Sequence, residues 1–252
     1  MKGPSTRLML AQGTLFTFHL SRPPSSWILA PGSLTFFAAD FSLLAMKNRP
    51  ALYDKQATSY DRTWRQYIAR TLGFLKATIS FRSSDKILDI ACGTGEFERL
   101  ILREHPDQQM IGIDISENML NFAREKCSAY PNAAFLKADA SALPFPDQTF
   151  DLVVSANSLH YFDKPNVSLA EMRRVLLPAG SLVILDWCKN YLICCCFDFF
   201  LRRVERGYQS CYTQRELQRL LDAAGFAIQS TRKIKLGSIF WGHMIAVATP
   251  KA

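Results

Sequence analysis

Residues 86–97, with the sequence KILDIACGTGEF, combine the residue types needed to hold a nucleoside. An apolar run typical of a β-strand ends here, a turn of small residues follows, and a helical pattern begins just after the second glycine. A strand, a glycine turn and a helix start in this order present backbone N–H groups to a ligand. We therefore expect a binding site at Asp89, Ala91, Gly93 and Gly95.

A second acidic residue follows at a distance suited to a ribose. Asp114 ends the β-like run 110–113, nineteen residues after Gly95. A carboxylate at about that distance beyond a glycine turn can accept hydrogen bonds from both ribose hydroxyls. The two motifs together predict a ligand built on a nucleoside.

The type of nucleoside ligand follows from what the turn lacks. Glu98 stands where a dinucleotide-binding G-x-G-x-x-G turn has its third glycine, and a G-x-x-x-x-G-K-[ST] loop is absent from the sequence. Glu96 begins the helix, and its carboxylate would repel a pyrophosphate. A ligand with a cationic centre and no phosphate fits better, which favours S-adenosylmethionine.

These motifs resemble the class I S-adenosylmethionine-dependent methyltransferases, especially the small-molecule branch that includes the ubiquinone/menaquinone-pathway enzymes. The resemblance covers roughly residues 53–185 and rests on five blocks in the family's order: 89–95, 112–119, 137–142, 150–162 and the turn 176–180. It implies a Rossmann-like, doubly wound α/β fold. The expected sheet has seven strands and is mostly parallel, with an antiparallel last strand inserted beside the previous one.

The resemblance also assigns the rest of the cofactor site. Ile115 and Met119 are expected to flank the adenine, although core packing explains Met119 equally well. Asp139, beside Ala140, can accept a hydrogen bond from the adenine amino group. Asn157 ends the fourth strand and should face the sulfonium, because ligands in open α/β sheets lie beyond the carboxyl ends of the strands.

Three further residues are candidates for catalysis. His160 follows the fourth strand and is the best-placed base, if the acceptor must lose a proton. Tyr60, in an expected helical cap over residues 46–82, and Asp186, at the end of the fifth strand, are candidate orienting groups. The alternatives are that His160 is an ordinary buried or surface group and that Tyr60 is a core aromatic.

Residues 188–212 form an apolar helical insert with three interpretations. The segment 191–201 is rich in aromatic and apolar residues, and basic residues follow it up to 206. It could line an apolar acceptor pocket, rest on a membrane surface through 191–206, or cover the sheet as a buried helix. The sequence leaves these alternatives open.

The chain length suits one α/β domain, residues 46–252, preceded by a different segment. Residues 1–45 contain no acidic residue before Asp40, so we expect a poorly ordered leader. It is either a targeting segment or an artefact of a start site upstream of Met46. The oligomeric state stays open.

The charge and the cysteine content indicate which partners and which cellular compartment to expect. The formal net charge is +8, but no Lys/Arg block or N-P-P-[YF] motif points to a nucleic-acid partner. Seven cysteines without a C-x-x-C pair indicate free thiols and no metal site. A reducing compartment, the cytoplasm or an organelle interior, is expected rather than secretion.

The sequence therefore predicts an enzyme that transfers a methyl group from S-adenosylmethionine to a small acceptor, apolar or aromatic in character. The alternative is a nucleoside-binding or regulatory protein with the same fold and no catalysis. The residue types at Asp89, Gly93, Gly95, Asp114 and Asp139 all suit cofactor binding, which favours the enzyme.

Overall fold

The computed structural model describes residues 7–9, 15–17, 49–205, 207–236 and 242–251, with side chains in the main domain from residue 60 onward. The chain divides into two units, Met1–Ser42 and Leu43–Ala252. In the first, β1 (Arg7–Met9) pairs antiparallel with β2 (Leu15–Thr17). The poorly ordered leader stays a prediction, and the rest of that segment lies outside the described residues.

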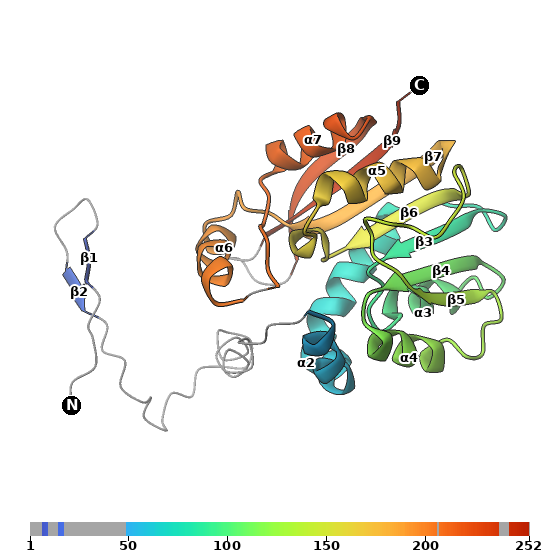
Figure 1. Ribbon diagram of the computed structural model, residues 1–252, viewed down its shortest axis with the longest axis horizontal. Helices are drawn as coiled ribbons and strands as arrows, with labels where there is room; N and C mark the ends of the chain where they lie inside the picture. Colours follow the sequence, from blue (N-terminus) through green and yellow to red (C-terminus); the bar gives the residue numbers. More distant parts are fainter. Residues whose placement is uncertain (1–6, 10–14, 18–48, 206, 237–241, 252) are drawn as a thin grey trace. The chain divides into compact units, whose positions relative to one another are not determined.

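The second unit is built on a seven-stranded sheet in the order β5-β4-β3-β6-β7-β9-β8 (Figure 1). Its strands are β3 (Lys86–Ile90), β4 (Gln109–Asp114), β5 (Ala133–Lys137), β6 (Phe150–Ala156), β7 (Leu176–Trp187), β8 (Phe226–Lys235) and β9 (Gly242–Pro250). The strands from β5 to β7 pair in parallel. The last strand, β9, lies between β7 and β8 and is antiparallel to both, which confirms the predicted fold.

Helices cover both faces of this sheet. The helices are α2 (Arg49–Thr78), α3 (Glu96–Leu102), α4 (Glu117–Lys126), the 3-10 turn η2 (Leu159–Tyr161), α5 (Pro165–Val175), α6 (Leu192–Val204) and α7 (Gln214–Ala223). One buried cluster joins α2, α3 and α4 to one face of the sheet, and another joins α5 and α7 to the opposite face. The inner parallel strands β3, β4, β6 and β7 are therefore apolar on both sides, as expected for a doubly wound sheet.

Alternation within a strand decides which helices it contacts. In β6, Leu152 and Val154 belong to the cluster under α2, α3 and α4, while Val153 belongs to the cluster under α5 and α7. Successive side chains of a strand point to opposite faces, so a continuous apolar run serves both layers. Strand β6 ends at Ala156, and the chain leaves the sheet at Asn157, which lines the cavity described below.

Side chains cap the first turns of two helices, α4 and α7. Met119 N donates to Ser116 Oγ at 3.2 Å, which caps α4 directly beside the expected ribose-binding acid. Thr213 and Glu216 form a reciprocal capping box at the start of α7. These caps satisfy N–H groups that a helix leaves unpaired.

The segment 176–180, expected as a turn before the fifth strand, instead belongs to β7. The pairing register between β6 and β7 shifts between the pairs Phe150–Leu176 and Leu152–Ser181, so the segment forms a bulge in a longer strand. A bulge takes up the extra residues without ending the strand. This correction does not move the carboxyl end of β7, where the strand approaches the site.

Candidate functional site

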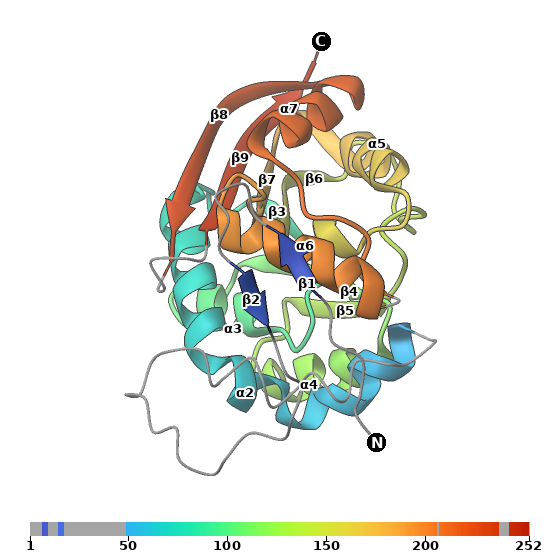
Figure 2. The same ribbon diagram turned by 90° about the vertical axis from the view of Figure 1, so that its left-hand side faces the viewer.

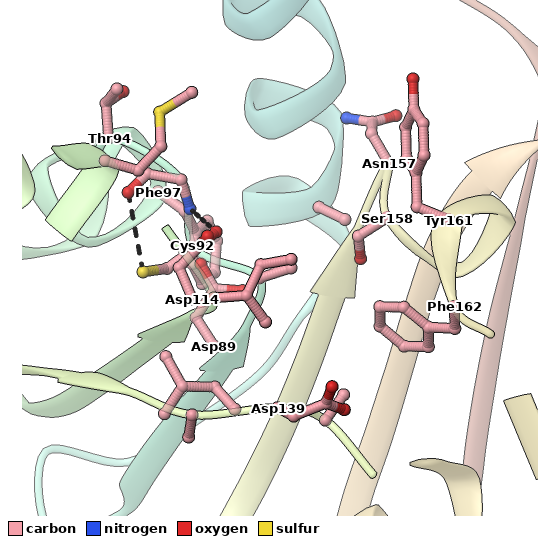
Figure 3. Close-up of a pocket in the computed structure, with 18 of the residues that line it drawn as sticks. Asp89, Cys92, Thr94, Phe97, Asp114, Asp139, Asn157, Ser158, Tyr161 and Phe162 are labelled. Atoms are coloured by element: carbon pink, nitrogen blue, oxygen red, sulfur yellow. Dashed lines mark hydrogen bonds between the residues drawn. The ribbon is translucent and has the colours of Figure 1, made fainter. Parts of the chain in front are cut away.

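A cavity of about 280 Å³ opens at the carboxyl ends of β3, β4 and β6 (Figure 3). Segments from five parts of the chain line it: α2, the loop between β3 and α3, the end of β4, the residues after β5, and the residues after β6. This is the edge where the connections to the next strand diverge on the two sides of the sheet. Ligands of open α/β sheets bind at such a switch point.

The glycine turn brings its backbone to the cavity wall. Ala91 and Gly93 have positive φ angles, 61° and 56°, and both line the cavity. A Cβ added to Gly93 would meet no heavy atom within 4 Å, so the turn leaves open space for a ligand there. This is the cradle that the sequence motif predicts.

Gly95 has a different role from the one expected. It is not among the described residues that line the cavity. A Cβ at this position would lie 2.8 Å from Ala123 Cβ, because α4 packs against the turn here. The φ angle of 72° also favours glycine. The absence of a side chain at Gly95 thus permits close helix packing, and any effect on a ligand is indirect.

Asp114 is fixed by backbone groups on both sides. Gly93 N donates to Oδ2 at 3.0 Å, and Ser116 N donates to Oδ1 at 2.9 Å. The side chain lines the cavity although it is largely buried. The carboxylate therefore links the end of β4 to the glycine turn and holds both at a defined separation.

The residues expected around the adenine gather at one end of the cavity. Ile115, Met119 and Ala140 contribute to its lining, and Met119 is also buried, so its two interpretations are compatible. Asp139 Oδ1 accepts hydrogen bonds from Ser141 N and Ser141 Oγ, both at 2.8 Å. These bonds orient the exposed Asp139 carboxylate at the cavity edge (Figure 3).

Three more carboxyl groups surround the turn. Burial raises the pKa of Asp89 well above its ordinary value, and Glu98 and Asp114 add to the effect. Burial also raises the pKa of Glu98 to about 8, and neither of its carboxyl oxygens has a hydrogen-bond partner among the described residues. Burial opposes ionisation of Glu96 too, but hydrogen bonds from Arg99 and Lys126 outweigh it and lower the pKa of that carboxyl. Glu96 thus brings negative charge to the cavity at neutral pH.

Helix α2 closes the cavity and is tied to the glycine turn by a cluster that sequence reasoning did not find. Asp61 accepts hydrogen bonds from Thr94 Oγ1 at 2.5 Å and from Lys126 Nζ at 2.6 Å. Lys126 also contacts Glu96 Oε2 at 2.9 Å. The Asp61 side chain has its partners in the glycine turn and on α4, which could not be inferred from spacing.

Tyr60 lines the cavity beside this cluster, as the prediction of a cap requires. Burial raises the pKa of its phenol to about 12, and the nearby Asp114 and Asp61 carboxylates add to the effect. The hydroxyl therefore keeps its proton at physiological pH. It can donate a hydrogen bond but is unsuited to act as a base.

Asn157 takes part in a buried network centred on Tyr67. Tyr67 Oη donates to Asn157 Oδ1 at 2.6 Å and accepts from Trp187 Nε1 at 2.8 Å. His243 Nε2 lies 3.3 Å from the same hydroxyl, and burial lowers the pKa of His243 to about 4. Asn157 has a φ of 55°, so the network holds a non-glycine residue in the left-handed region at the cavity wall.

His160 and Asp186 do not lie where the sequence predicted. Neither is among the described residues that line the cavity, and His160 is only 1% exposed. His160 Nδ1 lies 2.5 Å from Asp186 Oδ1, and the imidazole stacks on Trp187 with ring centres 4.3 Å apart. The 3-10 turn η2 rotates His160 inward, while its neighbour Tyr161 lines the cavity.

The wall opposite the glycine turn is aromatic. Figure 3 shows Asn157, Ser158, Tyr161 and Phe162 across the pocket from Asp114. Tyr161 and Phe162 immediately follow His160 in the sequence. The sequence motif 150–162 therefore pointed to the segment that lines the cavity, although His160 itself does not line it. No described lining residue comes from α6, so the structure does not support pocket lining among the three alternatives for residues 188–212.

Comparison with known proteins agrees with this geometry. Residues 87–180 match the family described as methyltransferase domain. The fold is similar to that of a methyltransferase solved in complex with the Trm112 methyltransferase activator of Haloferax volcanii. That match has a TM-score of 0.70 and 19% identity, and covers 79% of this chain and 96% of the other.

Two sequence relatives are closer in identity. The ubiquinone/menaquinone biosynthesis C-methyltransferase UbiE of Saccharophagus degradans is 32% identical over 198 residues, which cover 69% of this chain and 77% of that protein. The demethylmenaquinone methyltransferase of Symbiobacterium thermophilum is 34% identical over 166 residues, 60% of this chain and 63% of that protein.

This chain belongs to the class I S-adenosylmethionine-dependent methyltransferases. The predicted family, enzymatic activity and cofactor are therefore confirmed, and the non-catalytic alternative is not favoured.

Proposed function

We propose that this methyltransferase methylates a ring carbon of a small quinol-type acceptor. The observation that carries the proposal is the aromatic wall formed by Tyr67, Tyr161 and Phe162, in the same cavity as the glycine turn. A flat, electron-rich ring can pack on such a wall. The names of the relatives, quinone-pathway C-methyltransferases, support the same acceptor class.

In this proposal the cofactor lies between the glycine turn and the wall. Asp114 accepts hydrogen bonds from the ribose hydroxyls, and Asp139, beside Ala140, binds the adenine edge. Ile115 and Met119 flank the adenine ring. The open space above Gly93 and the lining by all of these residues support this assignment.

Charge supports a cationic ligand in the same place. Glu96 stays ionised because Arg99 and Lys126 stabilise its carboxylate, and it lines the cavity. Asp89, whose pKa is raised, would lose its proton more readily once a positive ligand is nearby. A pyrophosphate would meet repulsion from the same groups.

The bound cofactor supplies a methyl group on a positively charged sulfur, which is a strong donor. The chain's contribution is to hold the acceptor carbon in line with that group, and such orientation can supply on the order of 7–11 kcal/mol. Tyr60 and Tyr67 keep their phenolic protons, because burial raises both pKa values. The Tyr60 hydroxyl would therefore orient an acceptor oxygen as a donor, whereas Tyr67 donates to Asn157 Oδ1. The proton displaced from the ring carbon would leave to solvent.

His160 and Asp186 act as positioning residues in this scheme. Asp186 Oδ2 accepts from His160 N at 3.1 Å and Oδ1 accepts from Trp187 N at 2.6 Å. These bonds hold η2 against the end of β7. The pair therefore fixes the segment that carries Tyr161 and Phe162 without contacting the reacting atoms.

The test is a transfer assay with S-adenosylmethionine labelled in its methyl group. A reduced demethylnaphthoquinol and a demethylbenzoquinol, each in detergent, are compared with a primary amine of similar size. Label on a ring carbon of a quinol, located by NMR, is the expected result. Label on the amine or on a hydroxyl oxygen, with none on ring carbon, would reject the acceptor class while leaving the cofactor site intact.

A Phe162→Ala variant sharpens this assay. It removes part of the aromatic wall, so the KM for the quinol should rise about tenfold while affinity for the cofactor holds. The matched control is Phe145→Ala, a half-buried phenylalanine that packs against Phe150 away from the pocket lining. An equal rise in KM in both variants would indicate general destabilisation.

A further inference from the structure

Helix α6 is apolar on both sides: it buries Cys194 and Leu201 against the domain and also exposes large apolar side chains. A helix on a soluble domain buries its apolar stripe and exposes its polar one. In α6, Leu192 is 81% exposed, Phe199 62% and Phe200 45%. The inward face also includes Asp198, which is 3% exposed, and Glu205, directly after the helix, is buried as well.

The exposed apolar residues form one continuous stripe. Phe199 and Phe200 follow Leu192 by seven and eight residues, about two helical turns, which places all three on one side of the helix. Cys195 and Cys196 are exposed between the leucine and the phenylalanines, and Val204 extends the stripe at the C-terminal end. The helix has 13 residues, so the stripe is about 20 Å long.

The buried acid is held firmly and fixes which face points outward. Asp198 Oδ1 accepts from Tyr208 Oη at 3.0 Å and from Cys211 N at 2.7 Å. Its Oδ2 pairs with Lys189 Nζ at 2.7 Å and with Arg202 Nε at 3.0 Å. Rotating the apolar stripe inward would break all of these contacts, so the observed orientation is strongly preferred.

Cations border the stripe. Lys189 and Arg202 both pair with the carboxylate of Asp198, so two cations lie beside this helix. Arg203 places its guanidinium carbon 3.5 Å from the centre of the Phe199 ring, so its charge is held beside the exposed aromatic. Lys235 lies near Tyr191 at the other end of the helix.

The helix stands at an accessible edge of the domain. Figures 1 and 2 show α6 beyond the carboxyl ends of the parallel strands, outside the layers that cover the sheet. No described helix has the length and apolar character to cross a bilayer. An apolar stripe bordered by Lys and Arg is the pattern of a helix that lies in the plane of a membrane interface.

We propose that α6 docks this enzyme on the surface of an anionic lipid bilayer. The apolar stripe enters the boundary between head groups and acyl chains, and Lys189, Arg202, Arg203 and Lys235 contact anionic head groups. The charge pattern favours this occupant over a neutral apolar partner. The inference goes beyond the methyl-transfer reaction and does not depend on which acceptor is used.

Co-sedimentation of the full chain with vesicles tests the proposal. Vesicles of phosphatidylcholine alone are compared with vesicles that also contain phosphatidylglycerol. We expect binding to the anionic vesicles, weaker binding to the neutral ones, and a loss of the difference at high salt, because salt screens the head-group charges. Failure of the unmodified chain to bind anionic vesicles overturns the proposal.

Variants then locate the contact. Changing Phe199 and Phe200 together to Ser should lower partitioning at least about tenfold, since both rings leave water on docking. R203E should weaken binding to anionic vesicles only. The matched control is Val167→Ser on α5, which changes an apolar residue that is 45% exposed, as Phe200 is. If the double variant loses thermal stability, Leu192→Ser replaces it, because that side chain contacts little of the domain.

Two outcomes would show that something else covers this face. Unchanged vesicle binding in the Phe199/Phe200 and Leu192 variants would place the lipid contact elsewhere in the chain and reject α6. Concentration-dependent self-association without lipid, abolished by the same variants, would make the stripe an interface between copies and also overturn the proposal.

Discussion

At the scale of single residues, the carboxyl groups around the glycine turn divide into two kinds. Each oxygen of Asp114 accepts a hydrogen bond from a backbone N–H, which holds the carboxylate in position, whereas Glu98 is buried without a hydrogen-bond partner among the described residues. The first kind suits ligand binding and the second costs stability. Both can be tested by replacing a carboxylate with its amide, which keeps the size of the side chain.

Asp114→Asn should lower the affinity for S-adenosylmethionine at least about tenfold. The substitution removes a charge-assisted acceptor, worth roughly 1.5–3 kcal/mol, from the proposed ribose site. Calorimetry with the folded variant measures the effect. Asp151→Asn is the control, because Asp151 Oδ2 accepts from Lys86 N at the opposite end of the sheet. Unchanged affinity in Asp114→Asn would reject the ribose assignment.

Glu98 should make the folded state less stable as pH rises. Its pKa is raised from 4.5 to about 8, so between these values the folded state holds a proton that the unfolded state has released. The free energy of unfolding therefore falls with increasing pH across this window, by roughly 1–3 kcal/mol. Asp89 contributes in the same direction.

Chemical denaturation of Glu98→Gln between about pH 5 and pH 9 tests the direction of this pH dependence. The range runs from roughly the pKa of the unfolded state to just above that of the folded state. The variant should lose less stability over the window than the unmodified protein, and the remaining slope should come from Asp89. Glu125→Gln, an exposed carboxylate on α4, is the control and should leave the slope unchanged. A variant with the original slope would contradict the role of Glu98.

At the scale of elements, α2 is the helix that closes the site. Besides its apolar packing on the sheet, two polar clusters hold it: the Asp61 cluster at the glycine turn and the Tyr67 network at the end of the sheet. Polar contacts of this kind specify one position, because sliding the helix by a turn would leave several buried groups unpaired. The helix therefore sets the geometry of the pocket as well as covering it.

Tyr67→Phe should separate the effect of α2 on the stability of the domain from its effect on the geometry of the pocket. Loss of the hydroxyl leaves Asn157 Oδ1 and Trp187 Nε1 without their partner, which should lower the free energy of unfolding by about 1–3 kcal/mol. Turnover should fall more than cofactor affinity, because Asn157 and the aromatic wall lie at the proposed transfer site. Thermal melts and kinetics measure the two effects.

Tyr130→Phe provides the comparison for that variant. Tyr130 packs against the same buried cluster, and its hydroxyl makes no hydrogen bond among the described residues. Its replacement should leave both stability and turnover nearly unchanged. Equal effects in the two variants would show that the Tyr67 hydroxyl has no special role.

At the scale of the whole molecule, the chain has two units that are described separately. We predict that deleting residues 1–45 leaves the melting temperature and the cofactor affinity of the remaining protein nearly unchanged. The reason is that all described residues that line the cavity or form its two supporting clusters come from residue 60 onward. A large fall in melting temperature would show that the segment packs on the domain.

The sequence alone determined the order of strands and helices, the family and the cofactor. These follow from local signals: apolar runs of the right length, a glycine turn followed by an acid, and caps such as Ser116 and Thr213. Asp114, Asp139 and Ala91 line the cavity, and their roles there stay predictions. Their positions could be expected because each lies at or near the end of a strand or in a tight turn. At such positions the backbone alone fixes where a side chain begins.

Only the tertiary structure decided where the His160 side chain points, why position 95 needs a glycine and which face of α6 points outward. His160 lies one residue before the cavity wall, and the direction of its side chain depends on η2 and on Asp186 from another strand. The need for a glycine at position 95 depends on how closely α4 approaches the glycine turn. The outward face of α6 depends on Asp198 finding Lys189, Tyr208 and Cys211 inside the domain. Each outcome rests on contacts between segments distant in the chain or on the rotation of one turn, which residue spacing does not encode.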